Sequence, residues 1–249
     1  MLAVGGWLLV VGACDLLRAA RDTTSWSRRL LIAGLGVVLL VILGLSLGLS
    51  ASDWVGLGTV MIASFVVWVL ASSAALARGR AISKPLLVLA FGALVVGLAG
   101  TVAGGGVAQA SGATMPSSLG GSMAARLRLD QAVLLAGVAT VQLATANVLV
   151  RLILDAVGIP ATTNEKQLKG GRLLGPMERL FIVGLGLAGQ LTAAAVVVAA
   201  KGLLRFPELQ RVSAEGPSPD GPSDVPEYFL IGSFASWLFA LGGLALLLM

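Results

Sequence analysis

Histidine is absent from this chain of 249 residues, and cysteine occurs once, at Cys14. Without histidine the chain lacks the commonest general acid–base group and the commonest metal ligand. Catalytic arrangements that pair serine or cysteine with histidine are therefore excluded. A single cysteine also excludes an intrachain disulfide and a cysteine-based metal site. We expect neither a metal site nor a bound cofactor.

Charged residues are equally scarce, at 12% of the chain against 57% apolar residues. Soluble domains contain about 25% charged residues, so this chain has too little polar surface for a water-soluble fold. The sequence instead predicts an all-α polytopic membrane helix bundle of about seven transmembrane helices, each needing about 20 apolar residues. The predicted segments are 1–17, 30–50, 54–77, 85–103, 129–157, 177–200 and 228–249.

Lysine and arginine are distributed unevenly over the connections between these segments. In a seven-helix topology twelve of the seventeen lie on one side. Cytoplasmic loops are enriched in these residues, which predicts an outer N-terminus and a cytoplasmic C-terminus. The net charge of +5 is then a topology signal, and no basic–aromatic footprint for nucleic acid is present. The other side holds only Arg126, Arg128, Lys201, Arg205 and Arg211.

The chain divides into two predicted parts. Residues 1–103 form four closely spaced helices, and residues 125–249 form three helices with more polar content. Between them, residues 104–124 are rich in glycine and serine, which is typical of an irregular connection. Residues 206–226 form a second polar connection, rich in proline and acidic residues. Both read as solvated linkers, with a lid or docking loop as the alternative.

Glycine is abundant, with 33 residues, and many glycines lie inside the predicted spans. Small residues spaced four apart share a helix face and let helices approach closely in lipid. Packing inside the chain and contact with a second copy or a partner membrane subunit are both open interpretations. Besides these, membrane lipids are the expected partners. The predicted helix-packing glycines are Gly44, Gly48, Gly100, Gly104, Gly184 and Gly189.

Polar side chains gather in the fifth and sixth predicted helices. Thr140 and Asn147 begin a stripe along one face of the fifth helix, and the stripe continues at i+4 and i+8. The sixth helix begins after Pro176 with an acid–arginine pair in its first turn and carries a glutamine near mid-membrane. Polar groups at membrane depth face protein or water rather than lipid. The candidates for a polar cavity, a permeation path or a headgroup site are Asn147, Arg151, Asp155, Glu178, Arg179 and Gln190.

The C-terminal part runs GRLLGPMERLFIVGLGLAGQ, then AAKGLLRFPEL, then PEYFLIGSFAS. This pattern is similar to the C-terminal region of a bacterial integral membrane domain family of unknown function, over roughly the last 80 residues. Residues 211–226 depart from it as an insertion. The resemblance implies a protein of the bacterial inner membrane and supplies no activity. The matching positions are Gly171, Arg172, Gly175, Glu178, Arg179, Gly189, Gln190, Lys201, Arg205, Phe206, Glu227, Tyr228, Ile231 and Gly232.

Three functions fit this sequence. The first is a small transporter or channel component with a polar path between the fifth and sixth helices. The alternative is a non-catalytic membrane subunit or scaffold of a larger complex. The third is a membrane enzyme acting on lipid phosphates, which would use the boundary charges Arg151, Asp155, Glu178 and Arg179. No HExxH, GxSxG or SxxK motif is present, so no catalytic residue is assigned and an enzyme is disfavoured.

Overall fold

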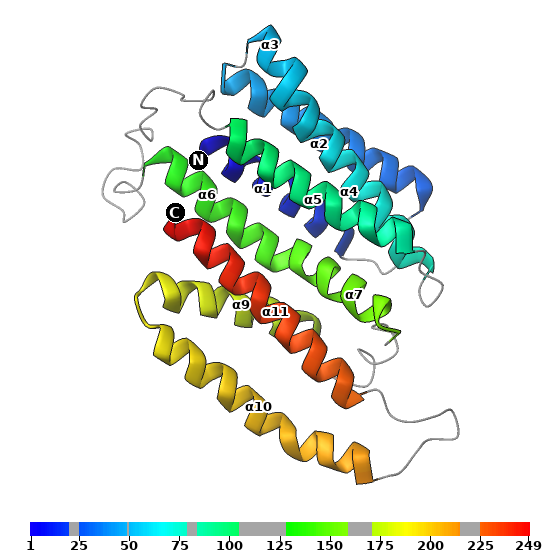
Figure 1. The fold of residues 1–249 in the computed structure, drawn as a ribbon, viewed down its shortest axis with the longest axis vertical. Coiled ribbons are helices and arrows are strands. Elements are labelled where there is room, and N and C mark those ends of the chain that lie inside the picture. Colours follow the sequence, from blue (N-terminus) through cyan, green and yellow to red (C-terminus); the bar gives the residue numbers. More distant parts are fainter. Residues whose placement is uncertain (20–24, 49, 79–83, 105–127, 159–170, 215–224) are drawn as a thin grey trace. The chain divides into compact units, whose positions relative to one another are not determined.

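The computed structural model describes residues 1–19, 25–48, 50–78, 84–104, 128–158, 171–214 and 225–249. Within these ranges all regular structure is helical, which confirms the all-α prediction (Figure 1). Five of the predicted segments coincide with helices that are long and apolar enough to cross a membrane, and these helices indicate membrane insertion. They are Trp26–Ser46, Trp54–Ala77, Pro85–Gly104, Leu129–Ala156 and Glu227–Leu248.

The described chain forms two compact units, Met1–Val148 and Leu149–Met249. The sequence placed all of residues 129–157 with the C-terminal part. In the structure the first half of this segment packs within the N-terminal unit, and the boundary between the units lies inside the helix. Residues 105–127, which include most of the predicted glycine-rich connection, lie outside the described residues.

The first helix, α1 (Leu2–Ala19), is the central element of the N-terminal unit. It contacts α2 (Trp26–Ser46), α5 (Lys84–Gly104) and α6 (Leu129–Thr140). A run of residues from Ala3 to Leu8 is buried on every face of the helix, as expected for a helix that is apolar all round. This central position follows from the near-uniform apolarity of the segment rather than from an amphipathic stripe.

Close approach between α1 and α6 depends on glycine. A Cβ atom at Gly137 would lie 2.4 Å from the carbonyl oxygen of Gly5, and one at Gly5 would lie 2.6 Å from the backbone of Leu134. Further along, a Cβ at Gly12 would lie 2.6 Å from Oγ1 of Thr140. The two backbones therefore touch directly, which is how helices associate in lipid where hydrophobicity supplies little attraction between them.

Three of the glycines predicted from spacing lie at helix contacts or in the interior. A Cβ at Gly100 would lie 2.5 Å from Val60 of α4 (Thr59–Arg78). One at Gly104 would lie 2.8 Å from Leu57, in the π-helical turn η1 (Trp54–Gly58) that precedes α4. Gly44 is buried on α2.

The other three predicted glycines do not pack against a neighbouring helix. Gly48 and Gly189 have φ angles of +67° and +73°, and both lie in turns that follow a helix. Gly184 has nothing within 4 Å of the position of a Cβ atom. Spacing alone does not separate a packing glycine from a turn glycine, because both are small residues in apolar sequence.

A second π-helical turn, η5 (Val141–Thr145), joins α6 to α7 (Ala146–Ala156). A π-helical turn contains more residues than an α-helical turn, so the side chains that follow it are rotated about the axis. Gln142 and Thr145 are buried in this turn, and η5 packs on α1. The predicted stripe that links Thr140 to Asn147 is interrupted here.

The C-terminal unit corrects the sixth predicted span. Residues 177–200 do not form one helix, because α9 (Gly171–Leu187) ends before Gly189 and α10 (Leu191–Ala214) begins after Gln190. The N–H of Gln190 donates to the carbonyl of Leu185 at 2.8 Å, and the N–H of Gly189 donates to that of Gly186 at 3.0 Å. This is the Schellman ending of a helix, in which glycine adopts the left-handed conformation.

Two further boundaries differ from the sequence prediction. α10 continues through residue 214, so the first part of the predicted polar connection 206–226 is helical. The rest of that connection, 215–224, lies outside the described residues, and α11 (Val225–Leu248) follows it. α9 packs against α11, and α7 approaches α11 where Leu154 lies beside Gly232.

Candidate functional site

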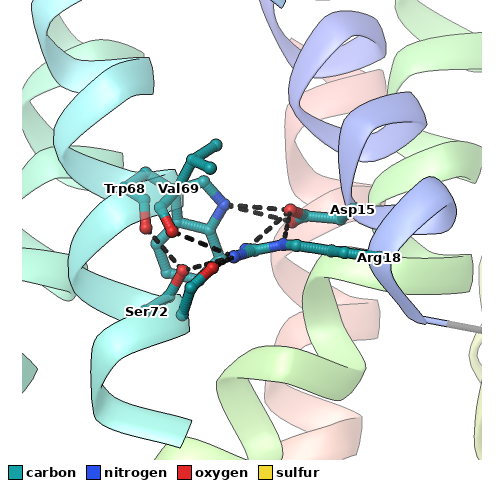
Figure 2. Close-up of polar contacts among 6 residues, drawn as sticks. Asp15, Arg18, Trp68, Val69 and Ser72 are labelled. Carbon is teal, nitrogen blue, oxygen red and sulfur yellow. Dashed lines mark hydrogen bonds and ion pairs between the residues drawn. The ribbon is translucent and has the colours of Figure 1, made fainter. Parts of the chain in front are cut away.

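Asp15 and Arg18 form a buried ion pair on α1. Their exposed fractions are 0% and 6%. Nε and Nη2 of Arg18 both lie 2.7 Å from Oδ1 of Asp15. The i, i+3 spacing places the two side chains on one helix face. Figure 2 shows both of them directed toward α4.

α4 supplies the remaining partners of this pair. The indole Nε1 of Trp68 donates to Oδ2 of Asp15 at 3.1 Å. Nη1 of Arg18 donates to the hydroxyls of Ser72 and Ser73, each at 2.8 Å, and to the carbonyl of Val69 at 3.3 Å (Figure 2). Charged groups taken out of water are costly unless they are paired and hydrogen-bonded. The cluster meets that requirement within the N-terminal unit and joins two helices that are far apart in sequence.

The C-terminal unit contains a second cluster with the same chemistry. Glu178 and Arg179 of α9 have exposed fractions of 7% and 1%. Nη1 of Arg179 donates to Oγ of Ser236 at 2.9 Å. Nε1 of Trp237 donates to Oε1 of Glu178 at 3.1 Å. In both units, therefore, an acid accepts from a tryptophan of a second helix while the neighbouring arginine donates to a serine of that same helix.

The position of Glu178 and Arg179 corrects the prediction that they lie in a first turn at the membrane boundary. α9 begins at Gly171, so this pair lies in the third turn, and Pro176 is inside the helix. Their partners Ser236 and Trp237 lie at the middle of the 24 residues of α11. The pair is thus level with the centre of a helix that is long enough to cross a membrane.

Gln190 moves in the opposite direction. The sequence places it near mid-membrane, whereas in the structure it is an exposed residue in the turn between α9 and α10. A Cβ at Gly186, just before that turn, would lie 2.3 Å from Leu244 near the end of α11. The turn is therefore level with one end of α11 and not with its middle.

The remaining predicted residues lie on α7. Asn147 donates from Nδ2 to the carbonyl of Leu143 at 3.2 Å, a contact within its own helix. It belongs to the N-terminal unit, while Arg151 and Asp155 belong to the C-terminal unit and are half-buried. Glu178 and Arg179 are the only two of the six predicted residues that the structure brings together with described contacts to another helix.

Sequence reasoning missed the first cluster because its charges looked like boundary charges. Arg18 was counted with the basic residues that follow the first helix. The available signal was an acid and an arginine at i, i+3 at the end of one span, with tryptophan and a serine pair in another. Among the described residues, no group of three or more Cys, Asp or Glu could hold a metal ion.

No protein-family model matches this chain, and neither a curated protein nor a solved structure was found to be similar to it.

Proposed function

We propose that this protein is a small membrane transporter or channel component that moves an ion, and that Glu178 and Arg179 are its charged element. The supporting observation is their burial beside Ser236 and Trp237, at the middle of an apolar helix of spanning length. Ionisable groups at this depth are rare in membrane proteins, and they mark ion pathways and proton relays.

The contacts of the pair favour a switchable arrangement. Glu178 accepts from Trp237, and Arg179 donates to Ser236, so the charges hold α9 against α11. A proton or cation that reaches Glu178 weakens its attraction for the adjacent guanidinium. The contact between the two helices then changes, and an ion can bias such a contact only through its different affinity for the two arrangements.

This proposal moves the polar path away from its predicted position. The path was expected between the fifth and sixth helices, with Asn147 and Gln190 on its walls. Asn147 bonds within its own helix and Gln190 lies in a turn, which leaves Glu178 and Arg179 as the predicted residues that support transport.

Reconstitution into vesicles tests the proposal. Purified protein is placed in vesicles with a potassium gradient and valinomycin, and fluxes of H⁺, Na⁺ and Cl⁻ are followed with internal dyes. We expect flux of one ion above that of protein-free vesicles, and a loss of about tenfold or more in Glu178→Gln, equivalent to about 1.4 kcal/mol in the barrier. Arg128→Gln, at an exposed residue before α6, is the matched control and keeps the wild-type flux. Wild-type flux equal to that of protein-free vesicles for all three ions contradicts the proposal.

The alternative function, a membrane subunit of a larger complex, draws support from α10. Its apolar part, Leu191–Ala200, is rich in alanine, and most of its side chains are exposed in the chain. Small residues on an open helix face favour association with another helix in lipid. Mild extraction followed by mass measurement tests this alternative. A partner at fixed stoichiometry supports it, and a chain that runs alone contradicts it.

A further inference from the structure

α9 and α10 form a helical hairpin, which bears on how the chain crosses the membrane. The turn between them is only three residues long, from Ala188 to Gln190 (Figure 1). Ile182 and Val183 of α9 pack with Ala194 of α10 in one apolar cluster. Since contact follows so closely after the turn on both sides, the two helices run in opposite directions.

α9 and α11 run in the same direction. Arg179 contacts Ser236, and Gly186 lies against Leu244. Seven residues further along α9 thus correspond to eight residues further along α11. The hairpin turn is consequently level with the end of α11, and the start of α9 lies toward the start of α11.

The second half of α10 must then lie toward the end of the unit where α9 and α11 begin. Lys201, Arg205 and Arg211 belong to this returning half. A single helix over residues 177–200 would have carried these three residues to the side opposite Arg172. The hairpin returns them to the same side.

This return strengthens the asymmetry of basic residues. With three residues moved, fifteen of the seventeen lysines and arginines lie on one side, instead of twelve. Arg126 and Arg128, next to the start of α6, are the two that stay on the other side. The excess of basic residues on cytoplasmic loops is the main determinant of orientation, and the hairpin satisfies this rule better than the seven-helix topology does.

We infer that α11 starts on the basic, cytoplasmic side and ends on the opposite side, together with the turn at Gly189. Following the chain from span to span, Leu248 then lies on the same side as Leu2. This replaces the expectation of a cytoplasmic end for the last helix. The inference concerns topology alone and stands whether or not the protein moves ions.

Cysteine labelling in intact cells tests this topology. Cys14 is buried in α1 and is replaced by Cys14→Ala to give a parent without cysteine. Single cysteines are then placed at four exposed positions by Ser25→Cys, Ser52→Cys, Gln190→Cys and Met249→Cys. Ser25 and Ser52 flank α2 and are the matched controls for its two sides. A membrane-impermeant maleimide is applied before and after permeabilisation.

We expect Met249→Cys and Gln190→Cys to label in intact cells as Ser52→Cys does, while Ser25→Cys labels only after permeabilisation. Labelling of Met249→Cys in the pattern of Ser25→Cys overturns the inference, whichever side is outside. Alkaline phosphatase fused after Met249 gives a second measurement that needs no cysteine variant. An active fusion agrees with the inference, and an inactive fusion that is expressed at the same level contradicts it. Vesicle flux is unaffected by either result, so the two proposals fail separately.

Discussion

The guanidinium of Arg18 lies over the indole ring of Trp68, with its Cζ atom 5.4 Å from the ring centroid. The same indole donates its N–H to Asp15. One aromatic side chain therefore contacts both members of the ion pair, the cation through the ring face and the anion through the ring edge. Stability of the N-terminal unit should depend on Trp68 in two separable ways.

Replacement of Trp68 separates these contributions. Trp68→Phe keeps an aromatic face for Arg18 and removes the donor to Asp15, and we expect a loss of about 2 kcal/mol in the free energy of unfolding. Trp68→Leu also removes the ring and leaves a cavity, for a total loss of about 4 kcal/mol. Reversible unfolding in mixed micelles measures both. Equal losses in the two variants would show that the N–H carries the whole effect.

Breaking the ion pair should cost more than removing it. Asp15→Asn leaves the buried guanidinium of Arg18 without its counter-charge, and we expect a loss of about 4 kcal/mol. The double variant Asp15→Leu with Arg18→Met removes both charges and should recover at least half of that loss. The same unfolding assay gives both values. A double variant as unstable as Asp15→Asn would mean that the pair itself stabilises the unit.

The glycine contact between α1 and α6 should tolerate no side chain. Gly137→Ala would place a Cβ 2.4 Å from the carbonyl oxygen of Gly5, and we expect a loss of about 2 kcal/mol as the helices separate. Gly34→Ala on α2 is the control, because nothing lies within 4 Å of its Cβ position. That change should stabilise the helix by up to about 1 kcal/mol. Thermal unfolding in detergent compares the two, and similar results for both would contradict direct backbone contact.

The hairpin turn should depend on one glycine of the two nearby. Gly189 has a φ of +73°, which a residue with a Cβ adopts at a cost of about 1 kcal/mol or more. Gly189→Ala is therefore expected to destabilise the C-terminal unit, and Gly189→Asn less so, since asparagine tolerates this conformation better. Gly184→Ala, five residues earlier in an open position of α9, should be neutral or stabilising. Unfolding followed by Trp237 fluorescence reports on this unit.

A pH-dependent contact precedes the third predicted span. Both Oγ and the backbone N–H of Ser50 donate to Oδ2 of Asp53, at 2.6 and 2.9 Å, and these bonds lower the pKa of Asp53. Because the folded pKa is lowered, the stabilisation is present above the unfolded pKa of about 3.9 and is lost as pH falls through the folded value. Ser50→Ala should raise the pKa of Asp53 toward its usual value. Carboxyl NMR shifts of labelled aspartate measure this, and an unchanged pKa would contradict the assignment.

Hydropathy located the spans well where apolar sequence and helix coincide. It failed at residues 177–200 because the turn itself is made of small and apolar residues, with Ala188 and Gly189 between leucines. A window average passes through such a turn without a dip. The helix ending is decided instead by backbone hydrogen bonds from Gly189 and Gln190, which hydropathy does not register.

The charge clusters were only partly predictable for a different reason. The acid–arginine pair at Glu178 was recognised, but its depth depends on where α9 begins, and sequence signals set the start too late, at Pro176. Trp68 lies 53 residues from Asp15, so their contact depends on the arrangement of helices in the bundle. Spacing along one helix contains no information about such a contact.

The π-helical turn at Val141–Thr145 has an evolutionary consequence. Such a turn is equivalent to a single inserted residue in an otherwise regular α-helix. Deleting one residue there would restore the regular helix and rotate everything beyond it by about 100°. Asn147 and the rest of α7 would then present a different face, while α6 stayed seated on α1. Homologues of this chain that differ in length by one residue at this position would therefore differ in which side chains α7 buries.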